Sequence, residues 1–263
     1  MNPDDPILAA LKMRWAAVAL SGSILLAVFW AGIGQHLGVD EAVRWLPFAL
    51  FAAGTVLGLL YRQLAENSTP DGKLLDTLGP PNLITVYRGF LVAFAAGFIF
   101  VPQDRLMANQ AFSWAPGTAY VIALLMDLAD GGLARRSGRT TELGRRLDTQ
   151  VDGLAVLCGS LLAVMWHKAP LWFVLVGMAY YLFCSGCRLQ AYFLKPCRIL
   201  PGSRIRRLLA GTMMVTIGVI LFPPVSSDLS RMLTSVVAVP FLVNFLKDWF
   251  AVSHVKPSLS KNA

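Results

Sequence analysis

Long apolar runs recur along the chain and constrain its fold more than any other feature of the sequence. Several stretches approach the ~20 residues that an α-helix needs to cross the hydrocarbon core of a bilayer. The predicted spans are residues 15–35, 43–61, 83–102, 117–134, 147–166, 170–192, 208–223 and 232–250. The segments between them carry Pro, Gly and charged residues, which are typical of helix ends and loops. The sequence therefore predicts an all-α polytopic membrane bundle of about eight transmembrane helices.

The composition excludes most other classes of protein. Apolar residues make up 56% of the 263 residues and charged residues only 14%, whereas soluble domains contain about 25% charged residues. Intrinsic disorder requires low hydrophobicity, and a disulfide scaffold requires many more than 4 cysteines. The first apolar run, which follows Lys12 and Arg14, is too long for the apolar region of a signal peptide. We therefore interpret it as a span of the mature protein.

Basic residues are distributed unevenly among the predicted loops. If the spans alternate in direction, most of the 23 Lys and Arg residues fall on the side that holds the N-terminus. Since Lys and Arg accumulate in cytoplasmic loops, we expect both termini to be cytoplasmic, in a multi-pass protein of the cell (inner) membrane. The formal net charge of +8 then reflects topology and attraction to the headgroups of membrane lipids. Nucleic acid is not an expected partner, because the basic residues are split among separate loops.

Four aspartates stand where a membrane span normally carries no charge. Asp127 and Asp130 lie three residues apart, and Asp148 and Asp152 lie four apart, so each pair shares one face of its helix. The connection between the two helices is short and basic, and we expect the helices to be antiparallel neighbours. Four carboxylates then converge near the cytoplasmic surface, where their mutual repulsion requires cations. Oxygen ligands in this number suit a pair of Mg²⁺ or Mn²⁺ ions that clamps a phosphate.

The residues between the aspartates favour a phosphate-containing ligand. Gly131 and Ala134 leave the helix surface open to the close approach of a bulky group. Arg135 offers a planar fork to phosphate oxygens, and Gly144 begins the next helix, where free N–H groups attract anions. The segment predicts metals, phosphates and a tight nucleotide pocket.

Other interpretations of these charged residues remain open. The aspartates are alternatively part of an ion-paired helix interface with Arg135, Arg136, Arg145 and Arg146. A cation transporter is a further alternative, although the acids gather at one end of two helices and only Asp248 would continue a path. Arg88, within a predicted span, is either a ligand or an anchor that snorkels to the membrane surface.

The spacing of these residues resembles the signature of the CDP-alcohol phosphotransferases, also called the CDP-alcohol phosphatidyltransferase family. The matching positions are Asp127, Asp130, Gly131, Ala134, Arg135, Gly144, Asp148 and Asp152. A second stretch, in which Pro81, Asn82, Thr85 and Arg88 occur in the order P-N-x-x-T-x-x-R, resembles the start of the first core helix of that family. The resemblance covers roughly residues 79–250. It implies a transmembrane hairpin and linker over 1–78, a six-helix core over 79–253 and a short cytoplasmic tail over 254–263.

The resemblance also implies roles for single residues. Asp127, Asp130 and Asp148 would bind metal, and Asp152 would complete the binuclear site and deprotonate the acceptor hydroxyl. The positions that would hold the CDP moiety are Asn82, Thr85, Gly131, Arg135 and Thr141, with Thr140 as an alternative to Thr141, and Ala134 and Gly144 belong to the same nucleotide pocket. The reaction would transfer a substituted phosphate from a CDP-alcohol to a hydroxyl and release CMP. Similar proteins are homodimers.

The acceptor is less constrained by the sequence. Basic residues gather after the sixth predicted span, on the side of the acids, and include Arg188, Lys195, Arg198 and Arg204. They form either a pocket for a phosphorylated acceptor or an ordinary basic cytoplasmic anchor. Arg188 lies within a span beside Ser185 and Gly186, and we expect it to face the bundle interior.

We favour CDP-diacylglycerol as the donor and a phosphorylated polyol, such as glycerol 3-phosphate, as the acceptor. Serine, inositol and phosphatidylglycerol are alternative acceptors, and a soluble CDP-alcohol transferred to diacylglycerol is an alternative arrangement. The first two spans contain no acid within their apolar runs. We interpret them as a packing hairpin without a chemical role.

Overall fold

The structure is a computed structural model that describes residues 6–69, 71–137, 141–193 and 203–253, apart from the side chains of 129–137 and 253. The described residues are almost entirely helical, with one isolated β-bridge between Ser68 and Leu74. The long helices are α1 (Pro6–His36), α2 (Val39–Gln63), α3 (Pro80–Gly97), α6 (Ala115–Ser137), α7 (Glu142–Met165), α8 (Val174–Tyr192), α9 (Arg204–Ile220) and α10 (Ser227–Ser253). Short elements connect them: η1 (Leu64–Glu66), η2 (Phe98–Phe100), α4 (Gln103–Ala108), α5 (Gln110–Ser113) and η3 (Leu171–Phe173).

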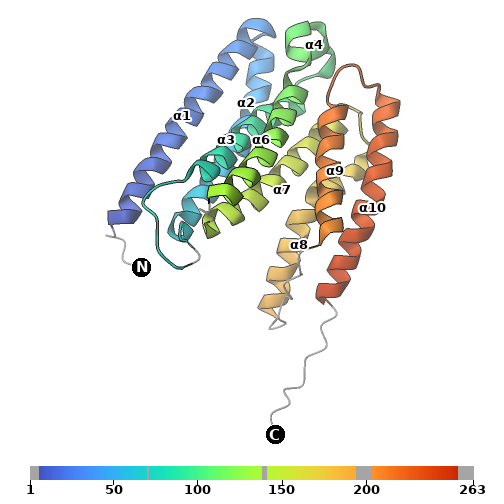
Figure 1. Cartoon of the computed structure of the whole chain (residues 1–263). Coiled ribbons are helices and arrows are strands. Elements are labelled where there is room, and N and C mark those ends of the chain that lie inside the picture. The colour runs from blue at the N-terminus through green and yellow to red at the C-terminus, as the bar shows by residue number, and fades with distance from the viewer. Residues whose placement is uncertain (1–5, 70, 138–140, 194–202, 254–263) are drawn as a thin grey trace.

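Each predicted span corresponds to one of the long helices. In the described part of the chain, 7 helical segments are long and apolar enough to cross a membrane. The remaining predicted span, residues 208–223, corresponds to α9, which has 17 residues. The prediction of an all-α polytopic bundle is confirmed. The start of α1 and the end of α10 lie at the same end of the bundle (Figure 1), while the side of the membrane to which that end belongs stays a prediction.

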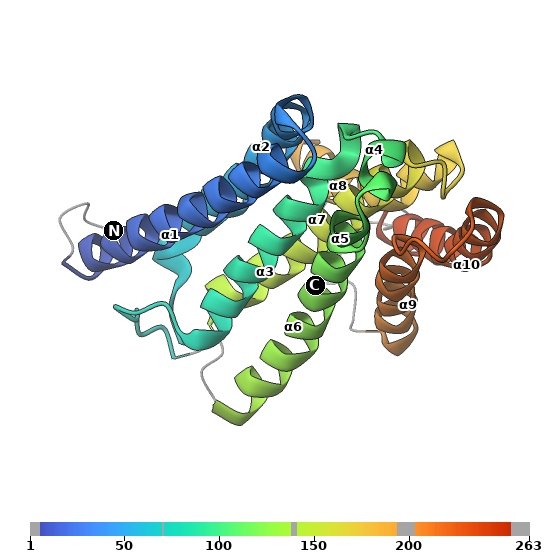
Figure 2. The same ribbon diagram turned by 90° about the horizontal axis from the view of Figure 1, so that it is seen from above.

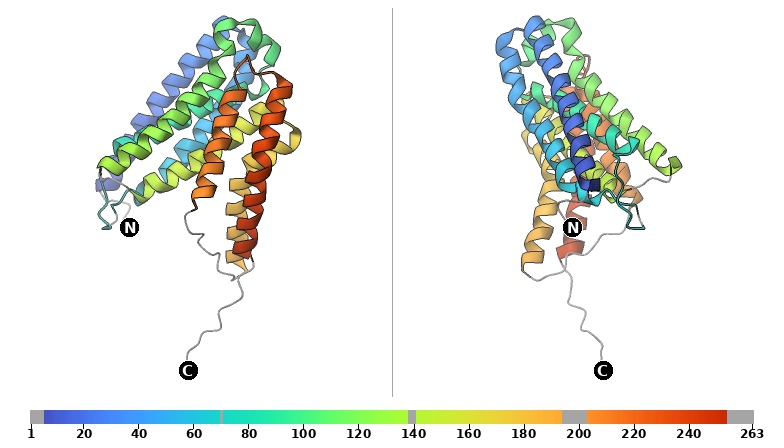
Figure 3. Two further views of the ribbon diagram at one scale, coloured as in Figure 1. Left: turned by 45° about the vertical axis from the view of Figure 1, so that its right-hand side comes forward. Right: turned by 90° about the vertical axis from the view of Figure 1, so that its left-hand side faces the viewer.

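Helix α3 lies at the centre of the bundle. It packs against α2, α6 and α7, with α1 and α2 on one side and α9 and α10 on the other (Figures 2 and 3). In its apolar segment 72% of the residues are buried, against 22% in α1 and 17% in α10, so the latter two are outer helices. Small residues let the neighbours approach: a Cβ at Gly97 would overlap the ring of Trp45, whose Nε1 donates to the Phe94 carbonyl at 3.0 Å.

The outer helices present apolar side chains on their exposed faces. Leu20, Ile24 and Val28 form an exposed stripe at four-residue spacing along α1. Exposed Val236, Val239 and Val243 do the same on α10. Monomeric soluble proteins seldom expose continuous apolar surface of this kind, whereas a bilayer covers it with lipid chains.

A buried lysine joins two loops at the end of the bundle where α7 and α9 end. Lys168 is only 2% exposed, and its Nζ donates to the carbonyl oxygens of Phe222 at 2.7 Å and Val225 at 3.1 Å. Burial lowers the pKa of the Lys168 amine from 10.5 to about 8. Between these two pH values the folded protein therefore binds fewer protons than the unfolded chain.

We expect the stability of the wild-type protein to rise, relative to Lys168→Met, as the pH increases from about 8 to about 10. Below this window the ammonium is charged in both states and its desolvation cost is present in full. Above the folded pKa the amine is neutral in the folded state and the cost falls, by on the order of 2 kcal/mol. Thermal unfolding midpoints in detergent measure this. Lys73→Met, at an exposed position, is the control. A difference in unfolding midpoint between the wild type and Lys168→Met that stays constant over this pH range would contradict the prediction.

Candidate functional site

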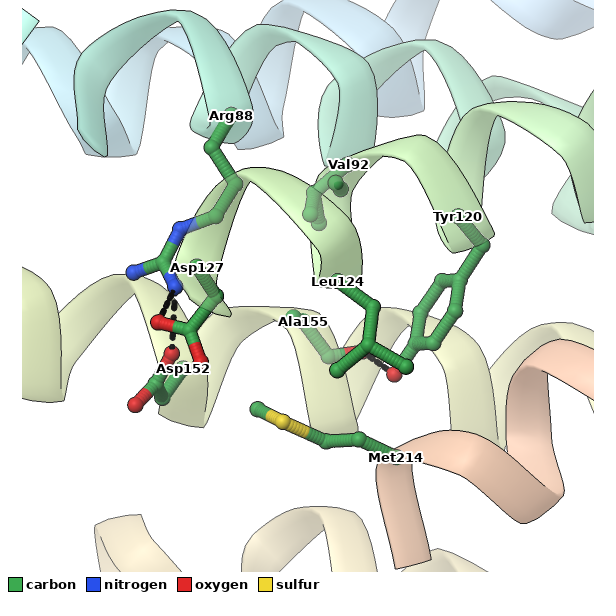
Figure 4. A pocket seen from close by; sticks show the side chains of 9 residues that line it. Arg88, Val92, Tyr120, Leu124, Asp127, Asp152, Ala155 and Met214 are labelled. Atoms are coloured by element: carbon green, nitrogen blue, oxygen red, sulfur yellow. Dashed lines mark hydrogen bonds and ion pairs between the residues drawn. The ribbon is translucent and has the colours of Figure 1, made fainter. Parts of the chain in front are cut away.

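Three helices bring three of the predicted aspartates and one arginine together. Asp127 comes from α6, Asp148 and Asp152 from α7, and Arg88 from α3. One carboxylate oxygen from each aspartate lies within 4.8 Å of the others. Figure 4 shows the side chains of Asp127, Asp152 and Arg88 pointing toward one another. The spacing of these acids along their helices, i and i+4 on α7, places both α7 carboxylates on the face that meets α3.

The two acidic helices do not pack as the sequence predicts. We expected α6 and α7 to be direct antiparallel neighbours, but both pack chiefly against α3. The aspartates meet across the space beside α3, and the long side chain of Arg88 extends between them. A site that lies between three helices leaves more room for a ligand than a closely packed pair would.

Arg88 occupies the centre of the aspartate cluster. Its side chain is 4% exposed, and Nη1 pairs with Asp127 and with Oδ1 of Asp152 at 3.0 Å. Nη2 pairs with Oδ1 of Asp148 at 2.6 Å. The alternative that Arg88 snorkels to the membrane surface is therefore wrong. Its guanidinium offsets the charge of three carboxylates that would otherwise repel one another.

The cluster has the donor chemistry of a divalent-metal site. The side chains of Asp127, Asp148 and Asp152 are 26%, 42% and 36% exposed, so their carboxylates are open to a ligand on one side. Carboxylate oxygens at this mutual distance suit Mg²⁺ or Mn²⁺. Asp130, the fourth predicted ligand, follows Asp127 by three residues on the helical backbone of α6, but its side chain is outside the described residues.

The predicted nucleotide residues Asn82, Thr141 and Gly144 meet where α3 and α7 begin. Thr141 is the N-cap of α7, and its Oγ1 accepts a hydrogen bond from the Gly144 N–H at 3.1 Å. Asn82 Nδ2 donates to the same Oγ1 at 3.3 Å. A Cβ at Gly144 would overlap Oδ1 of Asn82, so this position has room only for glycine. The cap thus holds the three residues together one turn before Asp148.

The start of α3 places a second row of predicted residues. Pro80 and Pro81 occupy its first positions, where their missing N–H groups cost nothing. Asn82, Thr85 and Arg88 follow at three-residue spacing and share a face. Thr85 is buried, and its Oγ1 donates to the Pro81 carbonyl at 3.1 Å.

Several predicted residues lie outside the described part of the chain. Asp130, Gly131, Ala134 and Arg135 belong to the end of α6, of which the structure describes only the backbone. Thr140, Lys195 and Arg198 belong to residues 138–140 and 194–202, which are not described.

The basic residues predicted to bind the acceptor are exposed where the structure describes them. Arg188 is exposed on α8, so the prediction that it faces the bundle interior is wrong. The reason is that α8 packs against α7 and α10, which cover only part of its circumference. Arg204, the first residue of α9, is also exposed. Among the described residues, no ion pair connects Arg188 or Arg204 with the aspartate cluster.

The structure tests part of the two non-enzymatic interpretations, since the side chains of Arg135 and Arg136 are outside the described residues. Arg145 pairs with Glu142 at 2.6 Å, and Arg146 pairs with Glu142 at 2.7 Å and with Glu66 at 2.9 Å. These two arginines therefore do not form the predicted interface with the aspartates. Asp248, the one acid that would continue an ion path, pairs with Arg206 at 3.1 Å.

A narrow pocket continues from the aspartates into the bundle. Arg88, Asp127 and Asp152 line its polar end, and Val92, Tyr120, Leu124 and Met214 line the rest (Figure 4). The Tyr120 hydroxyl donates to the Ala155 carbonyl at 3.1 Å, which connects α6 with α7. Sequence analysis did not find Tyr120, because a tyrosine in an apolar span carries no distinguishing pattern.

Asn67 is a second residue that sequence analysis did not find. It is fully buried, and its Oδ1 accepts a hydrogen bond from Asn82 Nδ2 at 3.3 Å. Its neighbours Ser68, Thr69, Pro70, Asp71 and Gly72 are all turn formers. An asparagine in such a stretch is typical of a turn and gives no sign of a contact with the site.

Comparisons with known proteins identify the family to which the sequence is similar. The model of the CDP-alcohol phosphatidyltransferase family matches residues 78–244. An archaetidylinositol phosphate synthase from Pyrococcus horikoshii is 30% identical over 123 residues, which are 45% of this chain and 60% of that protein. Among proteins with the name CDP-diacylglycerol--glycerol-3-phosphate 3-phosphatidyltransferase, the one from Bacillus subtilis is 30% identical over 41% of this chain and 60% of its own length. The one from Pseudomonas fluorescens is 34% identical over 36% of this chain and 45% of its own. The matches thus span about half of the relatives' length, and no solved structure matches the chain significantly.

Proposed function

Because this chain belongs to the CDP-alcohol phosphatidyltransferase family, we propose that it is a phospholipid-synthesis transferase. It moves the substituted phosphate of a CDP-alcohol to an acceptor hydroxyl and releases CMP. The observation that carries this proposal is the convergence of Asp127, Asp148 and Asp152 within 4.8 Å, directly after the Asn82, Thr141 and Gly144 junction. The aspartates provide ligands for metal, and the junction provides polar groups for a nucleotide.

The aspartates have separate roles in the proposed reaction. Asp127, Asp148 and Asp152, with Asp130 on the same helix as Asp127, would hold a pair of Mg²⁺ or Mn²⁺ ions. Such ions, when bound, supply positive charge that offsets the phosphates and the leaving group. Asp152 accepts the proton of the acceptor hydroxyl. The acceptor oxygen forms a bond to the phosphorus that bears the alcohol, and the bond from that phosphorus to CMP breaks.

Arg88 positions the carboxylates for this reaction. Its guanidinium is planar and pairs with Asp127, Asp148 and Asp152 at once, which fixes their relative orientation. It is buried and comes from the central helix α3, which packs against both α6 and α7. These features support a positioning role in which Arg88 keeps Asp152 aligned with the acceptor hydroxyl.

We also propose the finer identity of substrates and setting. CDP-diacylglycerol as donor and glycerol 3-phosphate as acceptor are supported by the names of the Bacillus subtilis and Pseudomonas fluorescens relatives. The distribution of basic residues supports an active site at the cytoplasmic face of the cell (inner) membrane, and the resemblance supports a homodimer.

The test is acceptor-dependent release of CMP. Purified protein in detergent is incubated with labelled CDP-diacylglycerol, Mn²⁺ and, separately, glycerol 3-phosphate, inositol phosphate, inositol, serine and phosphatidylglycerol. CMP release and a new lipid with glycerol 3-phosphate alone are the expected result. Release with another acceptor keeps the reaction class and changes the substrate. No release with any acceptor, nor with a soluble CDP-alcohol and diacylglycerol, in protein shown to be folded, would contradict the proposal.

Gly144→Ala is expected to weaken the binding of the CDP-linked donor. The added Cβ overlaps Oδ1 of Asn82 and lies 3.2 Å from Oγ1 of Thr141, so it displaces the Asn82 amide. Disruption of hydrogen bonds at such a junction raises the KM for the donor by about tenfold. The matched control is Gly58→Ala on α2, where a Cβ meets nothing within 4 Å. An equal KM in the Gly144→Ala and Gly58→Ala variants would show that the donor does not depend on this junction.

A further inference from the structure

Asn67 lies outside the residues that match the family, yet it contacts the proposed nucleotide site. The family match begins at residue 78, and Asn67 belongs to the segment that connects η1 with α3. Its Nδ2 donates to the carbonyl oxygens of Leu75 at 3.0 Å and Thr77 at 2.9 Å. Its Oδ1 accepts from Nδ2 of Asn82 at 3.3 Å. One buried side chain therefore joins the connecting segment to the start of α3.

The neighbouring residues fix this segment against α7, the helix that carries Asp148 and Asp152. Nε2 of Gln63 donates to Oε1 of Gln150 at 2.5 Å. Glu66 pairs with Arg146 at 2.9 Å, and the Glu142 N–H donates to the Ser68 carbonyl at 3.4 Å. Residues 63–68 thus run beside the first half of α7, and the position of Asn67 is determined from both sides.

The hydrogen bonds of Asn82 define which way its side-chain amide is oriented. A side-chain amide has two N–H donors on nitrogen and an acceptor oxygen. The nitrogen of Asn82 donates to Oδ1 of Asn67 and to Oγ1 of Thr141. The amide oxygen lies against Gly144 and fills the space that a Cβ there would occupy, so the buried amide is held between Asn67 and the start of α7.

We propose that Asn67 is a positioning residue for the CDP-linked donor. It accepts a hydrogen bond from Nδ2 of Asn82 and so holds that amide against Thr141 and Gly144 at the start of α7, where the proposed nucleotide site lies. This inference rests on the proposed function. It gives the segment after the first two spans a part in donor binding, where the sequence suggested packing alone.

Replacement of Asn67 separates orientation from folding. Asn67→Leu keeps the branched shape of the side chain but removes the acceptor, so the Asn82 amide loses one of the two oxygens to which its nitrogen donates and is held by Thr141 alone. Asn67→Asp keeps an acceptor for Asn82 Nδ2. Buried beside the Leu75 and Thr77 carbonyls, the new side chain is held as the neutral acid, whose O–H donates to one of them, so only one hydrogen bond is lost. Thr69→Val is the matched control, since it removes a side-chain hydrogen bond to the Lys73 carbonyl in the same segment without contact to Asn82.

The experiment measures CDP binding in the presence of Mg²⁺, together with kcat and the KM values for donor and acceptor, on the full chain in detergent. We expect Asn67→Leu to raise the Kd for CDP and the donor KM about tenfold, with kcat and the acceptor KM within about twofold of wild type. Asn67→Asp is expected to keep its Kd within about threefold, and Thr69→Val to match the wild type.

Three outcomes would overturn the inference. The first is a folded Asn67→Leu variant with the wild-type Kd for CDP. The second is a parallel change in kcat and both KM values, which a purely structural role would produce. The third, which applies even if Asn67→Leu does not fold, is a loss of CDP binding in Asn67→Asp as large as about tenfold. Wild-type protein that neither binds CDP nor releases CMP would instead contradict the proposed function, and the inference with it.

Discussion

Asp152→Asn is expected to lower the rate of CMP release by about a thousandfold or more. The substitution keeps the size of the side chain but removes both the proposed base and one negative ligand of the metal cluster. General-base catalysis alone contributes about 10²–10⁴ to a rate. The carboxylate of Asp152 lies within 4.8 Å of those of Asp127 and Asp148, so the loss of its charge also weakens the binding of metal. Initial rates of CMP release at saturating donor and acceptor measure the effect.

Asp228→Asn is the control for this substitution. Asp228 is exposed in the first turn of α10. Asp248, which pairs with Arg206, lies near the opposite end of the same helix. It is expected to retain the wild-type rate. Both variants are compared by thermal unfolding midpoint, so that a loss of rate is not confused with a loss of fold. A folded Asp152→Asn variant with a rate within about tenfold of wild type would exclude Asp152 as the base.

The sequence predicts those parts of the structure that depend on local periodicity. Each run of about 20 apolar residues forms a helix, because a backbone in lipid must satisfy its own hydrogen bonds. The placement of Asp148 and Asp152 on one face of α7 follows from their four-residue spacing alone. The Thr141 cap is also a local interaction, a hydroxyl three residues before the N–H that it binds, although we predicted Thr141 only as a nucleotide residue.

The parts that the sequence does not predict depend on contacts between distant segments. Arg88 lies 39 residues from Asp127 and 60 from Asp148, and only the packing of α3 between their helices shows that it pairs with both. The exposure of Arg188 depends on how much of α8 its neighbours cover. Asn67 resembles a turn residue until the start of α3 is placed against it. Periodicity assigns a residue to a face, whereas tertiary packing decides what that face meets.

Arg88→Met is expected to lower the stability of the protein without metal by about 3 kcal/mol, or roughly 6–10 °C in the unfolding midpoint. Methionine fills a similar volume but leaves Asp127, Asp148 and Asp152 without the cation that offsets them. Added Mn²⁺ is expected to raise the midpoint of Arg88→Met more than that of the wild type. The reason is that three carboxylates without Arg88 bind a cation more tightly, and tighter binding to the folded state stabilises it further. Thermal unfolding with and without millimolar Mn²⁺ measures both effects.

Two further variants decide whether the aspartate cluster is responsible for the lower stability of Arg88→Met and for its response to Mn²⁺. Arg145→Met removes an exposed ion pair with Glu142 and is expected to change stability by less than about 1 kcal/mol. Mn²⁺ is expected to raise the unfolding midpoint of this variant as much as that of the wild type. Arg88→Lys keeps one positive charge but lacks the planar fork that reaches three carboxylates, so its stability should fall between those of wild type and Arg88→Met. An Arg88→Met variant whose unfolding midpoint is not raised by Mn²⁺ would show that the metal does not bind at these aspartates. The proposed chemistry at Asp152 would then lack its metal site, since both depend on the same three carboxylates.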